Sequence, residues 1–215
     1  MRPEIIKINQ ESPEPSLVNY VAQQIKSGEV LGLPTDTFYG LAADPFNLRA
    51  VDRVYDIKSR SRHKPLSLLI EAVEQAEILA RPLPDEFYAL ARRYWPGPLT
   101  IIVKAASRLP LKVTANTGNV ALRVPAAAIP LAVVKAAGIP VTATSANLSG
   151  ASECTTAVEV RDQLENRISI IVDGGTSPRT VASTIVDLTD DDARWQVIRE
   201  GAIPTQDITK FFAEG

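Results

Sequence analysis

Several residue types and patterns are scarce in this 215-residue sequence, and each scarcity excludes a class of protein. Cys154 is the one cysteine, which excludes an internal disulfide, and with His63 as the one histidine there is no histidine cluster for a metal site. No stretch of about 18 uncharged apolar residues occurs, and the first 15 residues lack the apolar segment of a secretion signal. We therefore expect a cytoplasmic protein that has no membrane span and needs neither disulfides nor zinc.

Aromatic residues and net charge are also low. The chain is 6% aromatic, its formal charge is −2 and its pI is near 5.6. Binding of nucleic acid over a whole surface needs many unopposed Lys and Arg, and stacking on bases needs exposed aromatic rings. Any site for phosphate or RNA must therefore be local. A hydrophobic content of 45% over this length indicates one globular domain with a substantial core.

The spacing of apolar residues predicts helices and strands that alternate along the chain. Helices are expected at 17–25 behind Ser16 as N-cap, 51–57, 72–80, 84–94, 126–137, 156–166 and 204–212. Strands are expected at 30–33, 66–70, 99–103, 120–124, 141–144, 168–172, 184–188 and 195–199, with 34–41 as a loop. This alternation predicts an α/β fold with a mixed sheet, in which 1–15 is a polar lead, 16–201 is one domain and 202–215 is a C-terminal helix or tail.

Four basic residues crowd into positions 58–64, namely Lys58, Arg60, Arg62 and Lys64, whereas the whole chain has 23 Lys and Arg in 215 residues. Such a cluster repels itself unless it is solvated or faces an anion, and guanidinium and ammonium groups are the usual partners of phosphate oxygens. Charge alone leaves two interpretations open, a polyphosphate site and a solvated loop.

Two further segments are ambiguous when taken singly. Residues 141–150 pass from an apolar stretch into hydroxyl and amide residues, which suits both an anion-binding nest and a capped turn. Arg123 interrupts an apolar strand, so its guanidinium either reaches solvent or meets an anion such as a substrate carboxylate. Ser183 and Thr184 begin another predicted strand, where hydroxyls are common. No Walker-type or dinucleotide-binding glycine motif is present.

Taken together, these segments resemble the YrdC-like threonylcarbamoyl-AMP synthase family in its short, single-domain form. The motifs are, in chain order, PTDTFYGL at 34–41, KSR at 58–60, KPL at 64–66, WPGPLT at 95–100, LRVP at 122–125, SANLSG at 145–150 and STIVD at 183–187. They span about residues 16–201. Agreement of seven motifs in one order makes the resemblance specific.

The resemblance implies a twisted mixed β-sheet wrapped by helices around a concave basic cavity. It implies formation of threonylcarbamoyl-AMP and pyrophosphate from ATP, bicarbonate and L-threonine, for threonylcarbamoyladenosine modification of tRNA by downstream transfer proteins. Mg²⁺ would be held mainly by the ATP phosphates, with no protein side chain as a dedicated ligand. Threonine would contact Thr35, Arg123, Ser183, the backbone near Ala143 and position 69, where Leu69 replaces a histidine of longer relatives. ATP would contact Lys58, Arg60, Lys64, Asn119, Ser145 and Arg199, and Lys58, Arg60, Ser145 and Asn147 match the catalytic K-x-R and S-x-N signatures.

Alternative functions remain open at this point. A paralogous branch of the fold shares the ending seen at 184–191 but tends to lack the K-x-R and S-x-N pairs, and the basic run is compatible with a non-catalytic RNA-binding module. Retention of both pairs favours the synthase. A third possibility is carbamoyl transfer from another donor, because a related domain occurs in larger hydrogenase-maturation proteins. The absence of their zinc-finger and acylphosphatase segments from this sequence counts against it.

Overall fold

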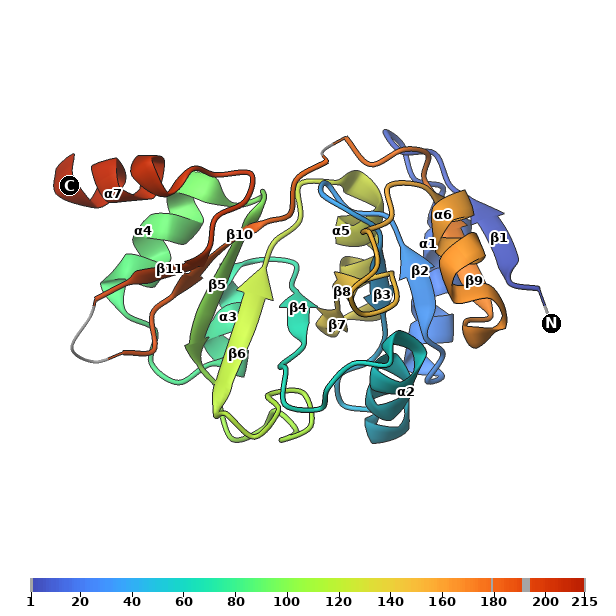
Figure 1. Cartoon of the computed structure of the whole chain (residues 1–215), viewed down its shortest axis with the longest axis horizontal. Coiled ribbons are helices and arrows are strands. Elements are labelled where there is room, and N and C mark those ends of the chain that lie inside the picture. Colours follow the sequence, from blue (N-terminus) through green and yellow to red (C-terminus); the bar gives the residue numbers. More distant parts are fainter. Residues whose placement is uncertain (1, 179, 191–193, 215) are drawn as a thin grey trace.

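The computed structural model describes residues 2–178, 180–190 and 194–214, in which eleven strands form two mixed sheets (Figure 1). The N- and C-termini lie at opposite ends of the long axis, next to the outer strands of different sheets. The sequence predicted one mixed sheet. The α/β class and the mixed pairing are confirmed, but the strands divide into a five-stranded and a six-stranded sheet.

The five-stranded sheet has the order β1-β9-β2-β3-β8. Its members are β1 (Glu4–Lys7), β9 (Ile170–Asp173), β2 (Leu31–Leu33), β3 (Gly40–Ala42) and β8 (Thr144–Ser145). β9 pairs parallel with both β1 and β2, while β3 pairs antiparallel with β2 and β8. Strand β1 lies inside the segment that the sequence predicted to be a polar lead, and β3 begins inside the segment predicted to be a loop.

The six-stranded sheet has the order β11-β10-β5-β6-β4-β7. Its members are β11 (Gln196–Arg199), β10 (Thr184–Asp187), β5 (Leu99–Lys104), β6 (Asn119–Arg123), β4 (Ser67–Leu69) and β7 (Val141–Thr142). The pairs β10–β5 and β4–β6 are parallel, and the other neighbours are antiparallel. Each of these strands falls on or within two residues of a segment that apolar runs predicted.

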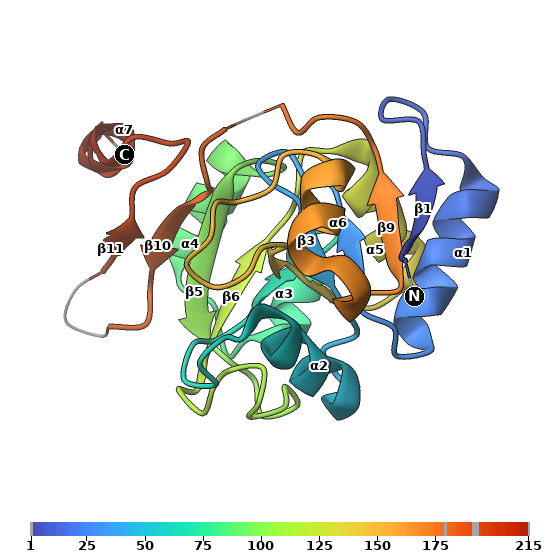
Figure 2. The same cartoon turned by 45° about the vertical axis from the view of Figure 1, so that its right-hand side comes forward.

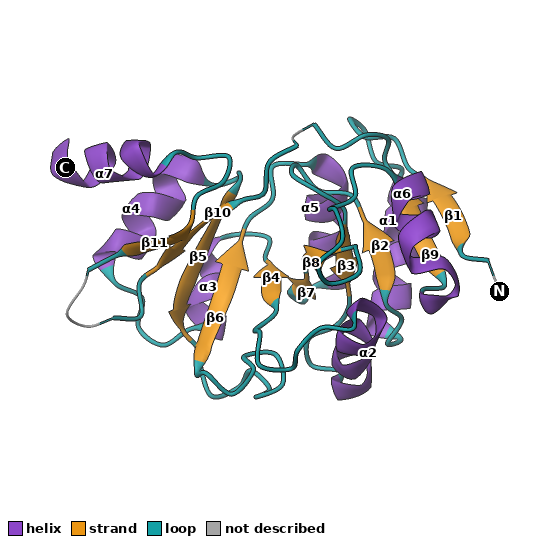
Figure 3. Cartoon of the chain, in the orientation of Figure 1, coloured by secondary structure: helices purple, strands orange, loops and turns teal. Residues whose placement is uncertain are grey.

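Seven α-helices among the described residues cover the sheets (Figure 3). They are α1 (Pro15–Lys26), α2 (Leu48–Lys58), α3 (Val73–Leu79), α4 (Asp85–Tyr94), α5 (Ala128–Ala137), α6 (Ala157–Leu164) and α7 (Thr205–Glu214), and a short 3-10 helix, η1 (Glu165–Arg167), follows α6. All seven predicted helices are confirmed. None of the helices in the described part of the chain is long and apolar enough to cross a membrane.

Helix α1 shows how the sequence produces these elements. Val18, Val21 and Ile25 recur at helical spacing and are buried against α5 and the five-stranded sheet. Figure 2 shows α1 and α6 on opposite sides of that sheet. The predicted N-cap at Ser16 is wrong, because the helix begins two residues earlier than predicted, at Pro15, whose fixed φ suits the first helical position, and Glu14 is the N-cap.

The segment 141–144 was predicted to be one strand, but residues 141–145 form two. Val141–Thr142 pair with β4 in the six-stranded sheet, and Thr144–Ser145 pair with β3 in the five-stranded sheet. Ala143 lies between them, and its amide donates to the Ser67 carbonyl at 2.8 Å. The chain therefore crosses from one sheet to the other at this residue, which places residues of both sheets around one cavity.

Candidate active site

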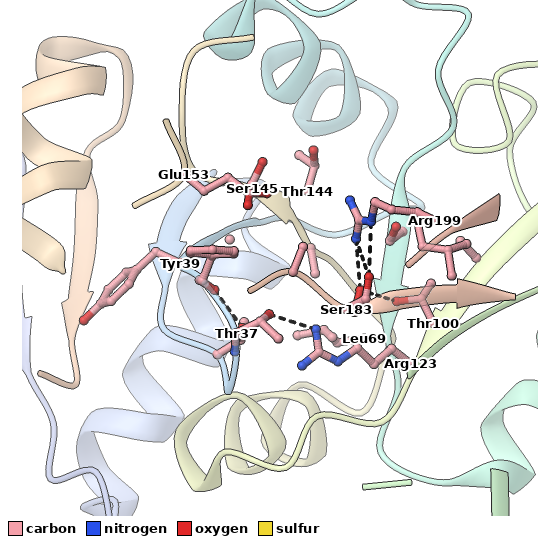
Figure 4. A pocket seen from close by; sticks show the side chains of 18 of the residues that line it. Thr37, Tyr39, Leu69, Thr100, Arg123, Thr144, Ser145, Glu153, Ser183 and Arg199 are labelled. Carbon is pink, nitrogen blue, oxygen red and sulfur yellow. Dashed lines mark hydrogen bonds between the residues drawn. The ribbon is translucent and has the colours of Figure 1, made fainter. Parts of the chain in front are cut away.

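A cavity of about 260 Å³ lies between the two sheets (Figure 4). Its polar and charged lining is Thr35, Thr37, Tyr39, Arg60, Ser67, Thr100, Arg123, Thr144, Ser145, Glu153, Ser183 and Arg199. Leu69, Ala121, Ala143 and Ile185 contribute apolar surface. Three guanidinium groups against one carboxylate give the described lining an excess of positive charge, which suits an anionic ligand.

Arg123, at the end of β6, is buried, with an exposed fraction of 6%. Its Nε donates to the Gly97 carbonyl at 2.9 Å and its Nη1 donates to Thr37 Oγ1 at 3.0 Å. Its Nη2 lies 2.5 Å from Asp36 Oδ1, a carboxylate that is also buried and that accepts from the Ala126 amide at 3.2 Å. The interpretation of Arg123 as a residue on a solvent-exposed face is therefore wrong, and the anion that it meets within the protein is Asp36.

The loop between β2 and β3 holds the hydroxyls that face Arg123. Thr35 Oγ1 donates to the Phe38 carbonyl at 2.7 Å and accepts from the Thr37 amide at 3.1 Å. These local bonds fix the turn, as hydroxyl side chains do in irregular segments. They place Thr35 and Thr37 in the cavity wall. Leu69 of β4 is the register partner of Arg123 on the neighbouring strand β6, and it adds apolar surface to the cavity wall.

Ser183 precedes β10 and connects to Arg199 of β11. Its Oγ is 2.9 Å from Thr100 Oγ1, and Arg199 Nη2 donates to the Ser183 carbonyl at 2.8 Å and to Ser183 Oγ at 3.2 Å. The segment after β11 packs closely against the segment before β10. Gly201 permits this packing, because a Cβ there would lie 2.3 Å from the Ala182 carbonyl oxygen. Burial lowers the pKa of the Arg199 guanidinium, which still stays charged near neutral pH.

The basic run 58–64 does not form one continuous patch. Arg60 turns into the cavity wall, and its Nη2 donates to the Pro65 carbonyl at 3.0 Å. Arg62 turns the other way, to Asp52 at 2.5 Å and Asp56 at 2.8 Å on α2. One cation of the run therefore faces a ligand site and another is already neutralised, which removes much of the charge on which an RNA-binding surface would depend.

Lys58, the last residue of α2, lies behind the cavity wall. Its exposed fraction is 2%, and Nζ donates to the Ser145 carbonyl, to the Asn147 carbonyl at 2.8 Å and to Asn147 Oδ1 at 3.0 Å. Ser145 Oγ in turn donates to Asn147 Oδ1 at 2.6 Å. Burial, reinforced by the nearby charge of Arg60, lowers the pKa of Lys58 to about 8. Lys58 of the K-x-R signature and both residues of the S-x-N signature are thus one hydrogen-bonded unit, whereas Arg60 donates to the Lys64 and Pro65 carbonyls.

The structure brings together most residues that the sequence nominated. Eight line the cavity: Thr35, Arg60, Leu69, Arg123, Ala143, Ser145, Ser183 and Arg199. Lys58 and Asn147 are buried directly behind Ser145 and reach the cavity through it. Asn119 shares a face of β6 with Ala121 and Arg123, beyond the end of the lining, and donates to Thr189 Oγ1 at 3.4 Å. Lys64 is exposed outside the lining, although its carbonyl accepts from Arg60 Nε at 3.4 Å.

Sequence reasoning missed Asp36, Thr37, Thr100 and Glu153. Asp36 and Thr37 belong to the motif PTDTFYGL at 34–41, and their position in this hydroxyl-rich segment was the signal that could have identified them. Asp36 and Arg123 are 87 positions apart, so no local pattern could pair them. Glu153 follows the S-x-N loop by six residues and carries no periodic signal at all.

Comparison with known proteins identifies the family. The model of the Sua5/YciO/YrdC family, which carries the description "Telomere recombination", matches residues 23–201. The chain belongs to this family. It is 36% identical to a threonylcarbamoyl-AMP synthase of Pyrococcus abyssi over 92% of this chain and 57% of that protein. Thus the chain spans little more than half the length of that relative.

Solved structures of the Sua5/YciO/YrdC family confirm the fold. P. abyssi Sua5 complexed with L-threonine superimposes with a TM-score of 0.93 at 35% identity, covering 98% of this chain and 61% of that one. E. coli YciO superimposes with a TM-score of 0.84 at 25% identity, covering 93% of this chain and 96% of that one. The family thus includes longer chains, such as P. abyssi Sua5, and chains of about this length, such as E. coli YciO.

Proposed function

We propose that this protein is an L-threonylcarbamoyladenylate synthase, which forms threonylcarbamoyl-AMP and pyrophosphate from ATP, bicarbonate and L-threonine. The observation that carries the proposal is one cavity whose lining includes both Arg123, at the end of β6, and Arg60, which follows α2. Similarity to a named threonylcarbamoyl-AMP synthase and to a Sua5 structure with L-threonine supports it. The proposed product would go to downstream transfer proteins that modify tRNA.

Threonine would bind on the side of the cavity formed by Arg123, Thr35 and Ser183. The guanidinium of Arg123 would hold the substrate carboxylate, for which its planar fork is suited. Asp36 and the Gly97 carbonyl fix that guanidinium from behind, so that little conformational freedom is lost on binding. Leu69 and Ala143 would limit the space around the substrate side chain.

ATP would bind along the other side, against Arg60, Ser145 and Arg199. Lys58 and Asn147 would position Ser145, and Asn119 would extend the contact beyond the cavity along β6. Lys64 would approach the phosphates from the exposed part of its loop. Guanidinium groups placed where phosphate charge develops stabilise the transition state of such transfers.

Magnesium fits this arrangement as an ion carried by the nucleotide. No group of three His, Cys, Asp or Glu that could hold a metal occurs in the described part of the chain. The cavity offers one carboxylate, that of Glu153, and the hydroxyl of Ser145. Mg²⁺ usually keeps several waters and binds through substrate phosphates with one or two carboxylates, so this donor set suits it. When bound, the ion would neutralise phosphate charge.

The chemistry divides into two bond-forming steps. The amino nitrogen of threonine bonds to the carbon of bicarbonate, and one oxygen leaves as water with the amine proton, which gives a carbamate. A carbamate oxygen then bonds to the α-phosphorus of ATP. The bond from that phosphorus to the oxygen bridging to the β-phosphate breaks, and pyrophosphate leaves with the electron pair. The protein's part is to orient the reactants in line and to neutralise charge.

Mass detection of threonylcarbamoyl-AMP tests the proposal most directly. The purified protein is incubated with ATP, Mg²⁺ and bicarbonate, together with threonine, serine or no amino acid. We expect the adenylate and stoichiometric pyrophosphate with threonine. Absence of both with threonine contradicts the synthase assignment.

Two variants test the division of the cavity. Arg60→Ala should raise the KM for ATP, and Arg123→Ala should raise the KM for threonine, each by roughly 10- to 100-fold, because each removes a charge-assisted hydrogen-bonding group facing a different anion. Equal, small changes in both constants for both variants would show that the two halves of the cavity are misassigned.

A further inference from the structure

Glu153 is the one acidic residue among the described residues that line the cavity. It is half-buried, and Figure 4 shows its side chain well apart from Arg123. Its carboxylate forms no hydrogen bond or ion pair with any described residue. Two other carboxylates behave differently, since Asp36 pairs with Arg123, and Asp52 pairs with Arg62 and Lys112.

The charge of Glu153 acts on Lys58 and Arg199, two residues on the proposed nucleotide side of the cavity. Its negative charge raises the pKa of Lys58 and of Arg199, in opposition to the lowering by burial. Lys58 bonds to Ser145 and Asn147, and Arg199 bonds to Ser183. Glu153 therefore lies within electrostatic range of the groups that would hold a triphosphate, although it forms no ion pair with them.

A carboxylate in this position opposes phosphate binding unless a cation lies between them. A role as the ion-pair partner of the other two arginines in the cavity lining does not account for it, because Arg60 and Arg199 donate to the Pro65 and Ser183 carbonyls and neither forms an ion pair with Glu153 among the described residues. The arrangement of one unpaired carboxylate, one hydroxyl and a polyphosphate is what Mg²⁺ takes in nucleotide sites.

We propose that the carboxylate of Glu153 is the contact between this protein and the magnesium ion carried by ATP, and that it makes nucleotide binding depend on the metal. This inference rests on the proposed function, because it requires ATP in the cavity. Without metal, Glu153 repels the phosphates. With metal, the same carboxylate attracts the complex, so that the site discriminates magnesium-bound ATP from free ATP.

Calorimetric binding of ATP, without threonine or bicarbonate, tests the proposal. Wild type, Glu153→Gln and the matched control Glu11→Gln, which removes an exposed carboxylate outside the cavity, are each titrated in MgCl₂ and in EDTA. In wild type and control we expect Mg²⁺ to tighten ATP binding by about 10-fold or more. In Glu153→Gln, free ATP should bind more tightly than to wild type, and most of the enhancement by Mg²⁺ should disappear.

Electron paramagnetic resonance of Mn²⁺ gives a second readout that is independent of turnover. Mn²⁺ titrated into the complex of protein and ATP should bind roughly 10- to 100-fold more weakly in Glu153→Gln than in wild type, the range found when a supporting ligand of a metal is removed. Circular dichroism spectra and unfolding midpoints that match wild type would establish that the variant is folded.

The possible outcomes separate the two claims. If Glu153→Gln tightens ATP by the same factor with and without metal, Glu153 acts as a charge alone and the inference is overturned while the synthase assignment stands. Equal Mn²⁺ affinity in wild type and variant also overturns it. If wild type binds ATP under neither condition, both the inference and the proposed function fail.

Discussion

Replacement of Lys58 by methionine tests the most unusual electrostatic feature of the site. Lys58 is a buried cation held by four acceptor oxygens, two from Ser145 and two from Asn147. Its pKa is lowered from 10.5 to about 8, chiefly by burial. The folded protein therefore holds this proton less tightly than the unfolded chain does. Between pH 8 and pH 10.5 the unfolded state binds more protons, so the stability contributed at this position rises with pH.

The magnitude follows from the two pKa values. Each tenfold change in proton affinity is worth about 1.4 kcal/mol, so the interval from 10.5 to about 8 corresponds to a penalty of about 3 kcal/mol. This penalty is fully present below pH 8 and is gone above pH 10.5. Between pH 7.5 and pH 10 wild type should gain roughly 2 kcal/mol of unfolding free energy relative to Lys58→Met, in which no proton is exchanged at this position.

Urea unfolding of both proteins, followed by tryptophan fluorescence at several pH values over this range, measures the difference directly. Groups that both proteins share cancel in the comparison. Lys26→Met is the matched control, because Lys26 lies exposed at the end of α1 and its replacement should give no such trend. A difference between wild type and Lys58→Met that stays flat with pH would refute the reasoning, since the acceptors would then hold the ammonium group as well as water does.

Three further changes should have defined effects. Gly97→Ala should lower the unfolding free energy by about 1–3 kcal/mol in urea titrations, because the new Cβ would lie 2.3 Å from the Tyr94 carbonyl oxygen. Asp36→Asn should lower it by about 3–5 kcal/mol, because it removes the carboxylate that neutralises buried Arg123, and an unchanged melting temperature would contradict that role. Burial raises the pKa of the Cys154 thiol to about 11, so at pH 8 it should react with a disulfide reagent about 100-fold more slowly in the native state than in urea, as followed by absorbance.

Helices were predicted well because their signal is local. In α1 the buried residues recur every three or four positions, and in α2 Asn47 caps the first turn through bonds to the Arg49 and Ala50 amides. Both signals lie within one short stretch of sequence. Pro15 was missed as the helix start because Ser16 offered a competing cap and the sequence does not show which of the two forms.

Short strands were harder to predict because pairing with distant partners defines them. β1 is four residues long with one buried side chain, and its partner β9 begins at Ile170. Gly40 and Leu41 read as part of a loop, but β2 on one side and β8 on the other make them a central strand. A strand of three or four residues has too few alternating positions to be recognised before its partner is known.

The site shows the same division between local and long-range information. The motifs contain most of the cavity residues, yet neither carboxylate that affects its electrostatics was nominated: Asp36 lies inside the first motif without an assigned role, and Glu153 lies outside every motif. Motif resemblance transfers residues that a family shares. Charge balance depends on which side chains meet in space, and Arg62 illustrates this, because its two carboxylate partners on α2 make it a structural residue although it lies in the same run as Arg60.

The crossing at Ala143 connects the fold to the chemistry. Each proposed substrate would be held by residues from both sheets. For threonine, Arg123 lies on β6 of the six-stranded sheet, whereas Thr35 lies between β2 and β3 of the five-stranded sheet. For ATP, Arg199 lies on β11 and Ser145 on β8, again one from each sheet. A small shift of one sheet against the other would therefore alter the proposed threonine and ATP contacts together, so the in-line placement of carbamate and α-phosphorus would depend on how the two sheets pack at Ala143.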